Sequence, residues 1–162
     1  MRYWLMKTEP ETFSIADLER VTVEPWTGVR NYTARGNMRA MAVGDPVLFY
    51  HSSTEPPGVA GLAEVARTGV VDETQFDPKS PYFDEKATRA RPRWDCVDVR
   101  YVATLPHYVE LAQIRADAQL ATMPLLQRGQ RLSVQPVTAK EYARIVALGR
   151  KAPKAPGKPK KK

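Results

Sequence analysis

The sequence predicts one α+β domain built around a curved or closed sheet. Three observations support this prediction. Short apolar runs with strand character outnumber the helical segments, and the helical segments fall at the ends of those runs. The chain has 162 residues, the size of one ordinary domain, and its 43% hydrophobic and 27% charged residues are typical of a globular protein.

The first quarter of the chain contains one predicted strand and two predicted helical segments. Tyr3–Met6 is a short apolar run and is predicted to be the first strand. Ser14 is placed to cap a short helix over Ile15–Arg20, with Asp17 as its capping-box partner. Tyr32–Met41 has the pattern of one or two further helical turns.

The centre of the chain is predicted to hold the heart of the sheet. Pro46–His51 suits a buried strand, and the turn signal Glu55–Gly58 leads into a second strand over Val59–Val71. Asp72–Pro92 is polar, contains three prolines and has no clear period, so we expect a long loop of the kind that is functional or mobile. Trp94–Leu105 alternates apolar and polar residues and predicts another strand.

The last part of the folded region is predicted to alternate helix, strand and helix. Val109–Ala116 has the pattern of a short helix, and Arg131–Val137 that of a last strand. Thr138 is placed to cap a final helix, with Glu141 at the third position, and Gly149 is predicted to end it.

The charge of the chain divides it into a body and a tail. The net charge is +7, and residues 150–162 carry seven cations and no acid. The remaining residues, 1–149, have 18 Lys and Arg against 18 Asp and Glu. We therefore expect a neutral folded domain over 1–149, followed by a disordered Lys- and Pro-rich basic tail over 150–162.

The sequence offers little for catalysis, metal binding or membrane insertion. It contains two histidines far apart, one cysteine, Cys96, inside a predicted strand, and no cluster of glycines that would cradle a phosphate. No apolar stretch approaches the length of a membrane helix, and we expect no signal peptide. We predict no catalytic residues, no metal and no cofactor.

One segment, residues 26–39, combines aromatic, amide and guanidinium groups without a single acid. Trp26 and Tyr32 offer flat faces for stacking, and Asn31 can bond a base edge through its donor and acceptor together. Arginine pairs with phosphate, so the predicted phosphate contacts are Arg30, Arg35 and Arg39. The alternative is that the aromatic residues belong to the core and the arginines form a solvated face.

Polar side chains also follow or interrupt several predicted strands. Lys7–Pro10 follows the first strand, Tyr50–Ser53 ends the second, and Ser133–Pro136 lies within the last. Polar groups at strand ends commonly form the mouth of a cleft, although ordinary turn residues would give the same pattern.

Taken together, these blocks resemble the EVE family over Arg2 to about Leu148. The resemblance rests on six ordered segments: residues 3–10, 26–32, 34–35 with 38–41, 44–45, 49–52 and 131–137. The family typically has Ser at the position of Thr8, which keeps the hydroxyl. It has Asn at the position of Gly36, so position 36 is left out of the predicted site.

The resemblance implies a PUA-like β-barrel of about five strands with short helices at its ends. It also implies kinship with the YTH readers of methylated adenine, and a non-catalytic reader of a modified nucleobase in DNA or RNA. The predicted base-binding pocket consists of Lys7, Thr8, Trp26, Asn31, Tyr32, Tyr50, His51, Ser52, Trp94, Ser133 and Gln135.

Two further expectations remain open at this stage. The alternative function is an RNA- or nucleotide-modifying enzyme, or an accessory domain of one, in which His51 with Glu9 or Asp45 would form an acid–base pair. We expect a monomer without membrane association, located in the cytoplasm, at the nucleoid if bacterial or in the nucleus if eukaryotic.

Overall fold

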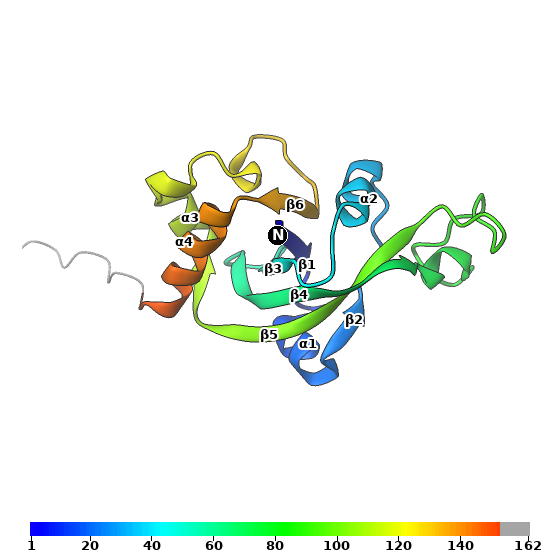
Figure 1. Cartoon of the computed structure of the whole chain (residues 1–162), viewed down its shortest axis with the longest axis horizontal. Helices are drawn as coiled ribbons and strands as arrows, with labels where there is room; N and C mark the ends of the chain where they lie inside the picture. The colour runs from blue at the N-terminus through cyan, green and yellow to red at the C-terminus, as the bar shows by residue number, and fades with distance from the viewer. Residues whose placement is uncertain (153–162) are drawn as a thin grey trace, which may run out of the picture.

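The structure is a computed structural model that describes residues 1–152, so residues 153–162 of the tail predicted over 150–162 lie outside the described residues, and Arg150 is the last residue of a helix. A six-stranded sheet forms the centre of the molecule (Figure 1). Its strands are β1 (Tyr3–Thr8), β2 (Val23–Pro25), β3 (Pro46–His51), β4 (Gly58–Val71), β5 (Asp95–Glu110) and β6 (Val134–Val137). Its helices are α1 (Ile15–Val21), α2 (Tyr32–Arg39), α3 (Leu111–Ala116) and α4 (Ala139–Arg150). Three short 3-10 turns complete the elements: η1 (Glu73–Phe76), η2 (Ala118–Leu120) and η3 (Pro124–Leu126).

The strand order is β2-β5-β4-β3-β1-β6. The β1–β3 pair is parallel and the other four neighbouring pairs are antiparallel. This curled sheet with short helices confirms the predicted α+β class. It has one strand more than the expected five, because the three-residue β2 is too short to show alternation in the sequence.

Both faces of the sheet are buried, which explains why β1 and β3 are almost continuously apolar. Successive residues of β1 enter different clusters: Trp4 and Met6 belong to one, and Leu5 belongs to the other. The helices divide between the two faces in the same way. The first cluster includes Leu18 of α1 and Met38 of α2, and the second includes Ile114 of α3 and Ile145 of α4.

Two of the predicted helix starts are confirmed in detail. Ser14 accepts a hydrogen bond from the backbone N–H of Asp17, whose carboxylate accepts one from the backbone N–H of Ser14. Thr138 and Glu141 form the same reciprocal pair at the start of α4. Each cap satisfies donors that the first helical turn cannot bond internally.

The C-terminal half differs from prediction in three places. The strand β5 runs on to Glu110, so Val109 is a strand residue and α3 begins only at Leu111. The cause is pairing with the start of β4, where Gly58 and Val59 stand opposite Glu110 and Val109. The last strand, in turn, begins at Val134 rather than at residue 131.

Gly149 does not end the last helix, which continues through Arg150. It is buried, and a Cβ atom at this position would come within 2.7 Å of the Leu105 side chain. The glycine therefore allows α4 to approach β5 closely, and it has a packing role in place of the predicted capping role.

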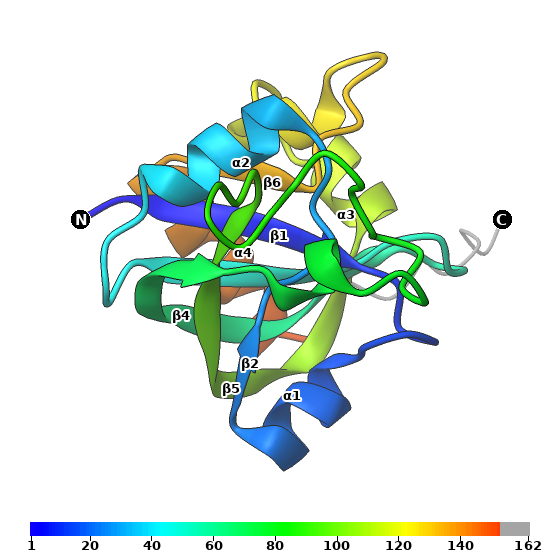
Figure 2. The ribbon, with the colours of Figure 1, turned by 90° about the vertical axis from the view of Figure 1, so that its right-hand side faces the viewer.

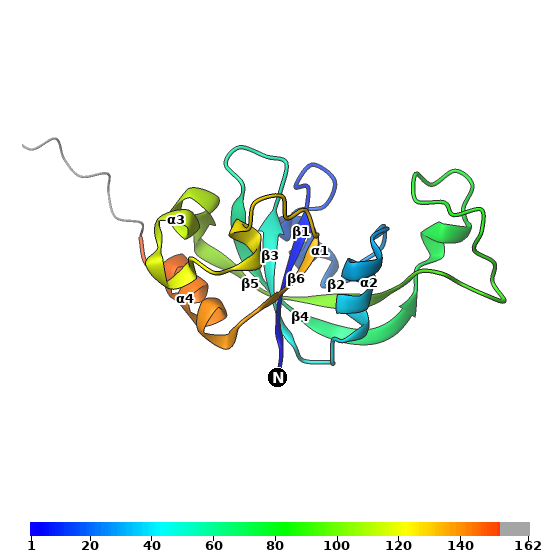
Figure 3. The ribbon, with the colours of Figure 1, turned by 90° about the horizontal axis from the view of Figure 1, so that it is seen from above.

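The long polar loop predicted between two strands is confirmed. Residues 72–94 connect β4 to β5, and together with the ends of those strands they form an arm that projects away from α3 and α4 (Figures 1 and 3). Figure 2 views the arm end-on, with α2 on one side of it and β2 with α1 on the other. The arm is thus placed beside α2, which belongs to the predicted reader segment 26–39, and beside β2, which directly precedes that segment.

Candidate functional site

A cleft of about 670 Å³ lies where several strands end. This volume is within the range of small-molecule sites in proteins. Its wall includes residues from five separated parts of the chain. They are Lys7, Thr8, Glu9, Thr12 and Phe13; Glu24 to Arg30; Ser52 and Ser53; Tyr82; and Arg131 with Ser133.

The parallel pairing of β1 and β3 creates this cleft, because it brings the carboxyl ends of both strands to the same edge of the sheet. Thr8 stands opposite His51, and the backbone N–H of Ser52 donates to the Thr8 carbonyl at 2.9 Å. The segment that enters β6 arrives beside them, since the N–H of Lys7 donates to the Ser133 carbonyl at 2.8 Å. Three predicted strand-end segments therefore meet as expected.

Trp26 connects the cleft to the core. Its ring is 7% exposed and meets Phe49 edge to face at a centroid distance of 5.6 Å. The indole N–H groups of Trp4 and Trp94 donate to carboxylates. Within residues 1–152, no hydrogen bond is formed by the Trp26 indole. Trp26 thus gives the cleft an aromatic side chain and an indole N–H that has no partner within residues 1–152.

Lys7 is the half-buried cation of the cleft. Burial lowers the pKa of its ammonium group, which lies 5.8 Å from the centroid of the Tyr50 ring. It forms no ion pair with any residue of the described range 1–152. A partly desolvated cation that forms no ion pair favours the binding of an anion.

Arg30 lines the cleft, but its guanidinium is bound within the protein. Nε and Nη2 donate to the Tyr82 carbonyl at 3.0 and 2.8 Å. Nη1 donates to the Val29 carbonyl and to Asp72, both at 2.9 Å, and Nη2 also donates to Thr74 at 3.0 Å. These five bonds equal the five donors of a guanidinium. Arg30 consequently fixes the arm to the segment after β2.

Tyr32 and Trp94 stack on each other outside the cleft, with centroids 5.1 Å apart. Trp94 is 6% exposed and its indole donates to Asp84 at 2.8 Å. The guanidinium of Arg35 lies 4.6 Å from the centroid of the Tyr32 ring, and its Nη1 donates to the Arg93 carbonyl at 2.6 Å. This layered group joins α2 to the base of the arm.

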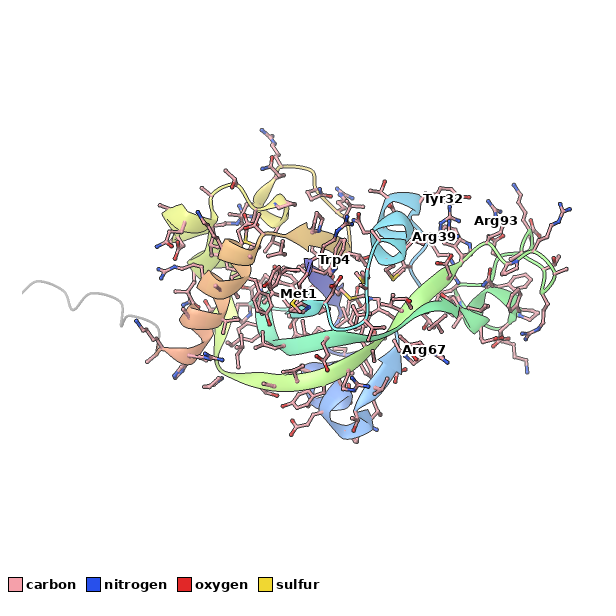
Figure 4. The ribbon with its side chains drawn as sticks, in the orientation of Figure 1. Met1, Trp4, Tyr32, Arg39, Arg67 and Arg93 are labelled. Carbon is pink, nitrogen blue, oxygen red and sulfur yellow. The ribbon has the colours of Figure 1, made fainter. Side chains whose placement is uncertain are left out.

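Asn31 and Arg39 also bond to the protein. Asn31 caps α2 by accepting from the Ala34 N–H at 3.0 Å. Arg39 forms two-pronged contacts with Asp95 at the start of β5. Figure 4 shows Arg39 with Tyr32 on the side of α2 that faces the arm. Neither Asn31 nor Arg39 lines the cleft.

Three further residues of the predicted pocket lie behind its wall. Tyr50 is 3% exposed and packs in the second cluster. Gln135 is 1% exposed and donates to the Leu132 carbonyl at 2.8 Å, bracing the turn before β6. His51 accepts a hydrogen bond from the backbone N–H of Ile15 at 3.1 Å. They support the strand ends and do not line the cleft.

The acid–base pair considered for an enzyme does not form in this structure. His51 uses Nε2 to accept from Ile15, and burial lowers its pKa. Asp45 lies elsewhere, where it accepts from the Trp4 indole at 3.0 Å. Within residues 1–152, neither Asp45 nor Glu9 forms an ion pair or a hydrogen bond with His51. No set of three or more potential metal ligands is grouped in that range, and no helix there has the length and apolarity to cross a membrane.

Sequence reasoning missed several wall residues. Arg131 is exposed in the loop before β6, and Tyr82 comes from the middle of the arm. Thr12 and Phe13 come from the segment before α1. A usable signal existed for Tyr82, because it and Phe83 are adjacent aromatic residues in an otherwise polar loop. No comparable signal marks Thr12.

The fold defines a PUA-like α+β domain, and this domain has a cleft at the ends of its strands. The EVE domain family model matches residues 2–148. The chain belongs to the EVE domain family.

Three comparisons, two of them with the human protein, show how close the similarity is. Human thymocyte nuclear protein 1 is 37% identical over 170 residues, covering 93% of this chain and 75% of that protein. A solved hypothetical protein from Leishmania major is 51% identical with a TM-score of 0.88, covering 92% of this chain and 94% of that one. Human THYN1 protein, solved in complex with 5-methylcytosine-containing DNA, is 36% identical with a TM-score of 0.89, covering 94% of this chain and all of that one (100%).

Proposed function

We propose that this protein is a non-catalytic reader that binds DNA by taking 5-methylcytosine into the strand-end cleft. The observation that carries the proposal is the similar human structure, which was solved in complex with 5-methylcytosine-containing DNA. The cleft supplies what a base needs, namely an aromatic side chain, hydroxyl groups and a cation that forms no ion pair within residues 1–152. A base that stacks on an aromatic ring gains ~1–3 kcal/mol.

The base contacts are assigned to the predicted residues that line the cleft. Trp26 contacts the ring, and the hydroxyls of Thr8, Ser52 and Ser133 bond its polar edge. Lys7, which is half-buried and forms no ion pair within residues 1–152, binds the phosphate that follows the base. These five residues come from four segments, so the site is sensitive to the geometry of all of them.

The carboxylates of the cleft favour a base that carries an exocyclic amino group, as cytosine does, over thymine. Glu9 and Glu24 line the wall and are hydrogen-bond acceptors, while cytosine carries an exocyclic amino donor. A methyl group at carbon 5 adds only ~0.8 kcal/mol if it fills an apolar slot. The expected preference for 5-methylcytosine over cytosine is therefore about fourfold.

The remaining residues have two roles in this proposal. Arg131 at the cleft contacts the DNA backbone beside the base, whereas the predicted phosphate contacts Arg35 and Arg39 join the frame through the Arg93 carbonyl and Asp95. Arg30 holds the arm in place. The frame behind the wall consists of Asn31, Tyr32, Tyr50, His51, Trp94 and Gln135.

The absence of chemistry on the base is part of the proposal. It is supported by His51, which is bonded to a helix N-terminus and not to an acid. General acid–base catalysis needs a titrating group within hydrogen-bond reach of the reacting atom. A bound oligonucleotide recovered with unchanged mass after long incubation is the expected outcome, and a changed mass would favour the enzyme alternative.

The test is a titration of fluorescent oligonucleotides that differ at one position, cytosine or 5-methylcytosine, in DNA and in RNA of the same sequence. We expect tighter binding of methylated DNA by about fourfold. Trp26→Phe keeps an apolar ring but removes the indole N–H, and it should lower affinity by about fivefold or more and abolish the methyl preference. Tyr142→Phe, on α4 at the opposite face, is the matched control and should change neither.

Two results would overturn the proposal. One is equal affinity of the intact protein for methylated and unmethylated DNA. The other is an unchanged methyl preference in a folded Trp26→Phe protein, as judged by its melting curve. Stronger binding of the RNA series would move the proposal from DNA to RNA. Sedimentation of the same complexes tests the expected monomer.

A further inference from the structure

A second hollow lies next to the cleft and shares part of its wall. It measures about 460 Å³ and is lined by Arg30, Arg93 and residues 81–86 of the arm. Arg30 and Tyr82 line both hollows. Tyr82 therefore separates two adjacent sites, each of a volume suited to a small ligand.

Two neighbouring aromatic side chains, Tyr82 and Phe83, are exposed at this place, 41% and 42% respectively. Adjacent exposed aromatic rings beside a hollow indicate a contact surface, because an aromatic ring left in water gives up the free energy of its burial. Phe83 belongs to the second hollow but not to the cleft. Its ring is thus available to a ligand that extends beyond the first site.

The loop that carries these rings is held by specific bonds. Arg30 donates twice to the Tyr82 carbonyl, and the Asp84 N–H donates to the Gln75 carbonyl at 3.0 Å. The Tyr82 ring also packs onto Gly28, where a Cβ atom would come within 2.8 Å of it. Since Gly28 has φ +87°, glycine suits both the backbone and the contact. The Tyr82 ring and the backbone that carries Phe83 are consequently held in place, which reduces the entropy lost on binding.

The charges of the second hollow leave one cation available. Asp84 accepts from the Trp94 indole at 2.8 Å and lies 3.4 Å from Arg93, so its charge is compensated. Lys86 is exposed and forms no ion pair with any residue in the described range. Glu85 is also exposed, and its negative charge repels an anion on its side of the second hollow. A phosphate would therefore lie against Lys86.

We propose that the second hollow binds the nucleotide adjacent in the strand to the base held in the cleft. Its base stacks on Phe83, Tyr82 separates the two bases, and its phosphate contacts Lys86. This inference rests on the proposed function, because it requires a nucleic-acid strand in the cleft. It assigns the arm a direct role in binding, and it predicts a site two nucleotides long.

The experiment measures the affinity for single-stranded DNA with a central 5-methylcytosine and an abasic nucleotide placed immediately before or after it. In the intact protein, removing the base on one of the two sides should weaken binding by about five- to hundredfold. Phe83→Ala should weaken binding of the strand that keeps all its bases by a similar factor. The affinity of this variant should not change further when the same flanking base is removed. Phe83→Leu, which keeps the bulk but not the flat ring, should be intermediate.

Phe76→Ala is the matched control, since Phe76 lies in η1 of the same arm but lines neither hollow. It should retain the full dependence on the flanking base. Two results overturn the inference: an intact protein indifferent to both flanking bases, or a Phe83→Ala protein that keeps the flank dependence. An abasic nucleotide at the central position tests the proposed function separately. If affinity is unchanged when the central base is removed, the proposed function itself has failed. If affinity falls, only the inference about the second hollow has failed.

Discussion

The segment 26–39 and the strand ends around Lys7, Ser52 and Arg131 differ in where their polar groups find partners. In the segment, Arg30 bonds the arm and Arg39 pairs with Asp95. At the strand ends, Lys7 and Arg131 form no ion pair within residues 1–152, although both line the cleft. The segment 26–39, which has the densest group of aromatic, amide and guanidinium side chains, thus contributes mainly to the frame. The strand ends, which have fewer such side chains, form most of the wall of the cleft. Whether a polar group already has a hydrogen-bond or ion-pair partner in the protein distinguishes the frame from a binding surface better than residue composition does.

The largest expected effect concerns the frame. Asp72 is 1% exposed and accepts from the Gly28 N–H, from Arg30 and from Thr74. Asp72→Ala leaves the Arg30 guanidinium without its carboxylate and should lower the free energy of unfolding by ~3–5 kcal/mol. Denaturant unfolding measures this. Glu73→Ala, which removes an exposed ion pair with Arg89, should cost under ~1 kcal/mol.

The pH dependence sharpens the same point. Burial raises the pKa of Asp72, but the hydrogen bonds from Thr74, Arg30 and Gly28 outweigh burial, so the pKa is lowered overall. The stabilisation is then complete above 3.8, the ordinary pKa of this carboxyl group, and is lost as pH falls through the lowered value. The stability difference between the intact protein and Asp72→Asn should shrink over that acidic range. A difference that stays constant would show that the charge of Asp72 does not stabilise the frame.

A smaller effect is expected at the wall. Lys7→Met should weaken DNA binding by about tenfold at low salt and reduce the slope of log affinity against log salt by about one. Unfolding stability should stay equal or rise, because a partly buried charge is removed. Binding isotherms at several salt concentrations measure the slope.

Lys140→Met, at an exposed position of α4, is the control for Lys7→Met and should leave the slope unchanged. Because burial lowers the pKa of Lys7, its contribution to affinity should fade with rising pH before 10.5, the ordinary lysine value, is reached. If the slope of log affinity against log salt is identical in Lys7→Met and Lys140→Met, Lys7 does not contact phosphate. The contrast between the two regions would then be lost.

The smallest effect is expected for Arg39→Ala. Its pair with Asp95 is half exposed, 50% for Arg39 and 25% for Asp95, and should contribute no more than ~1 kcal/mol to stability. DNA affinity should change by less than about twofold. If affinity falls further and the salt slope drops by about one, Arg39 exchanges Asp95 for phosphate on binding, as the sequence predicts.

Local patterns predicted the local structure well. Pro46–His51 is a strand with the predicted bounds, and the caps at Ser14 and Thr138 formed. These features depend on residues a few positions apart. The role predicted for Gly149 was wrong, because this glycine makes a long-range contact with Leu105 of β5 that the local sequence does not show.

The cleft was predictable where a polar residue directly follows a buried strand, as for Thr8 and Ser52. It was not predictable where the sequence could not tell which face a side chain meets. Tyr50 and His51 end the strand that Ser52 follows. Tyr50 nevertheless packs in the second cluster, and His51 bonds the backbone of Ile15. Arg30 could not be recognised as bound, because Asp72 and Tyr82 lie far along the chain.

The pairing of β1 with both β3 and β6 has a consequence for synthesis of the protein on the ribosome. Lys7 and Thr8 emerge early, but Ser133 and the strand after it emerge near the end of the folded region. Long-range strand pairing of this kind forms late and slowly. A nascent chain interrupted before β6 contains Trp26 but lacks one wall of the cleft. Completion of the cleft therefore waits for β6, and under the proposed function we expect incomplete translation products to bind DNA weakly.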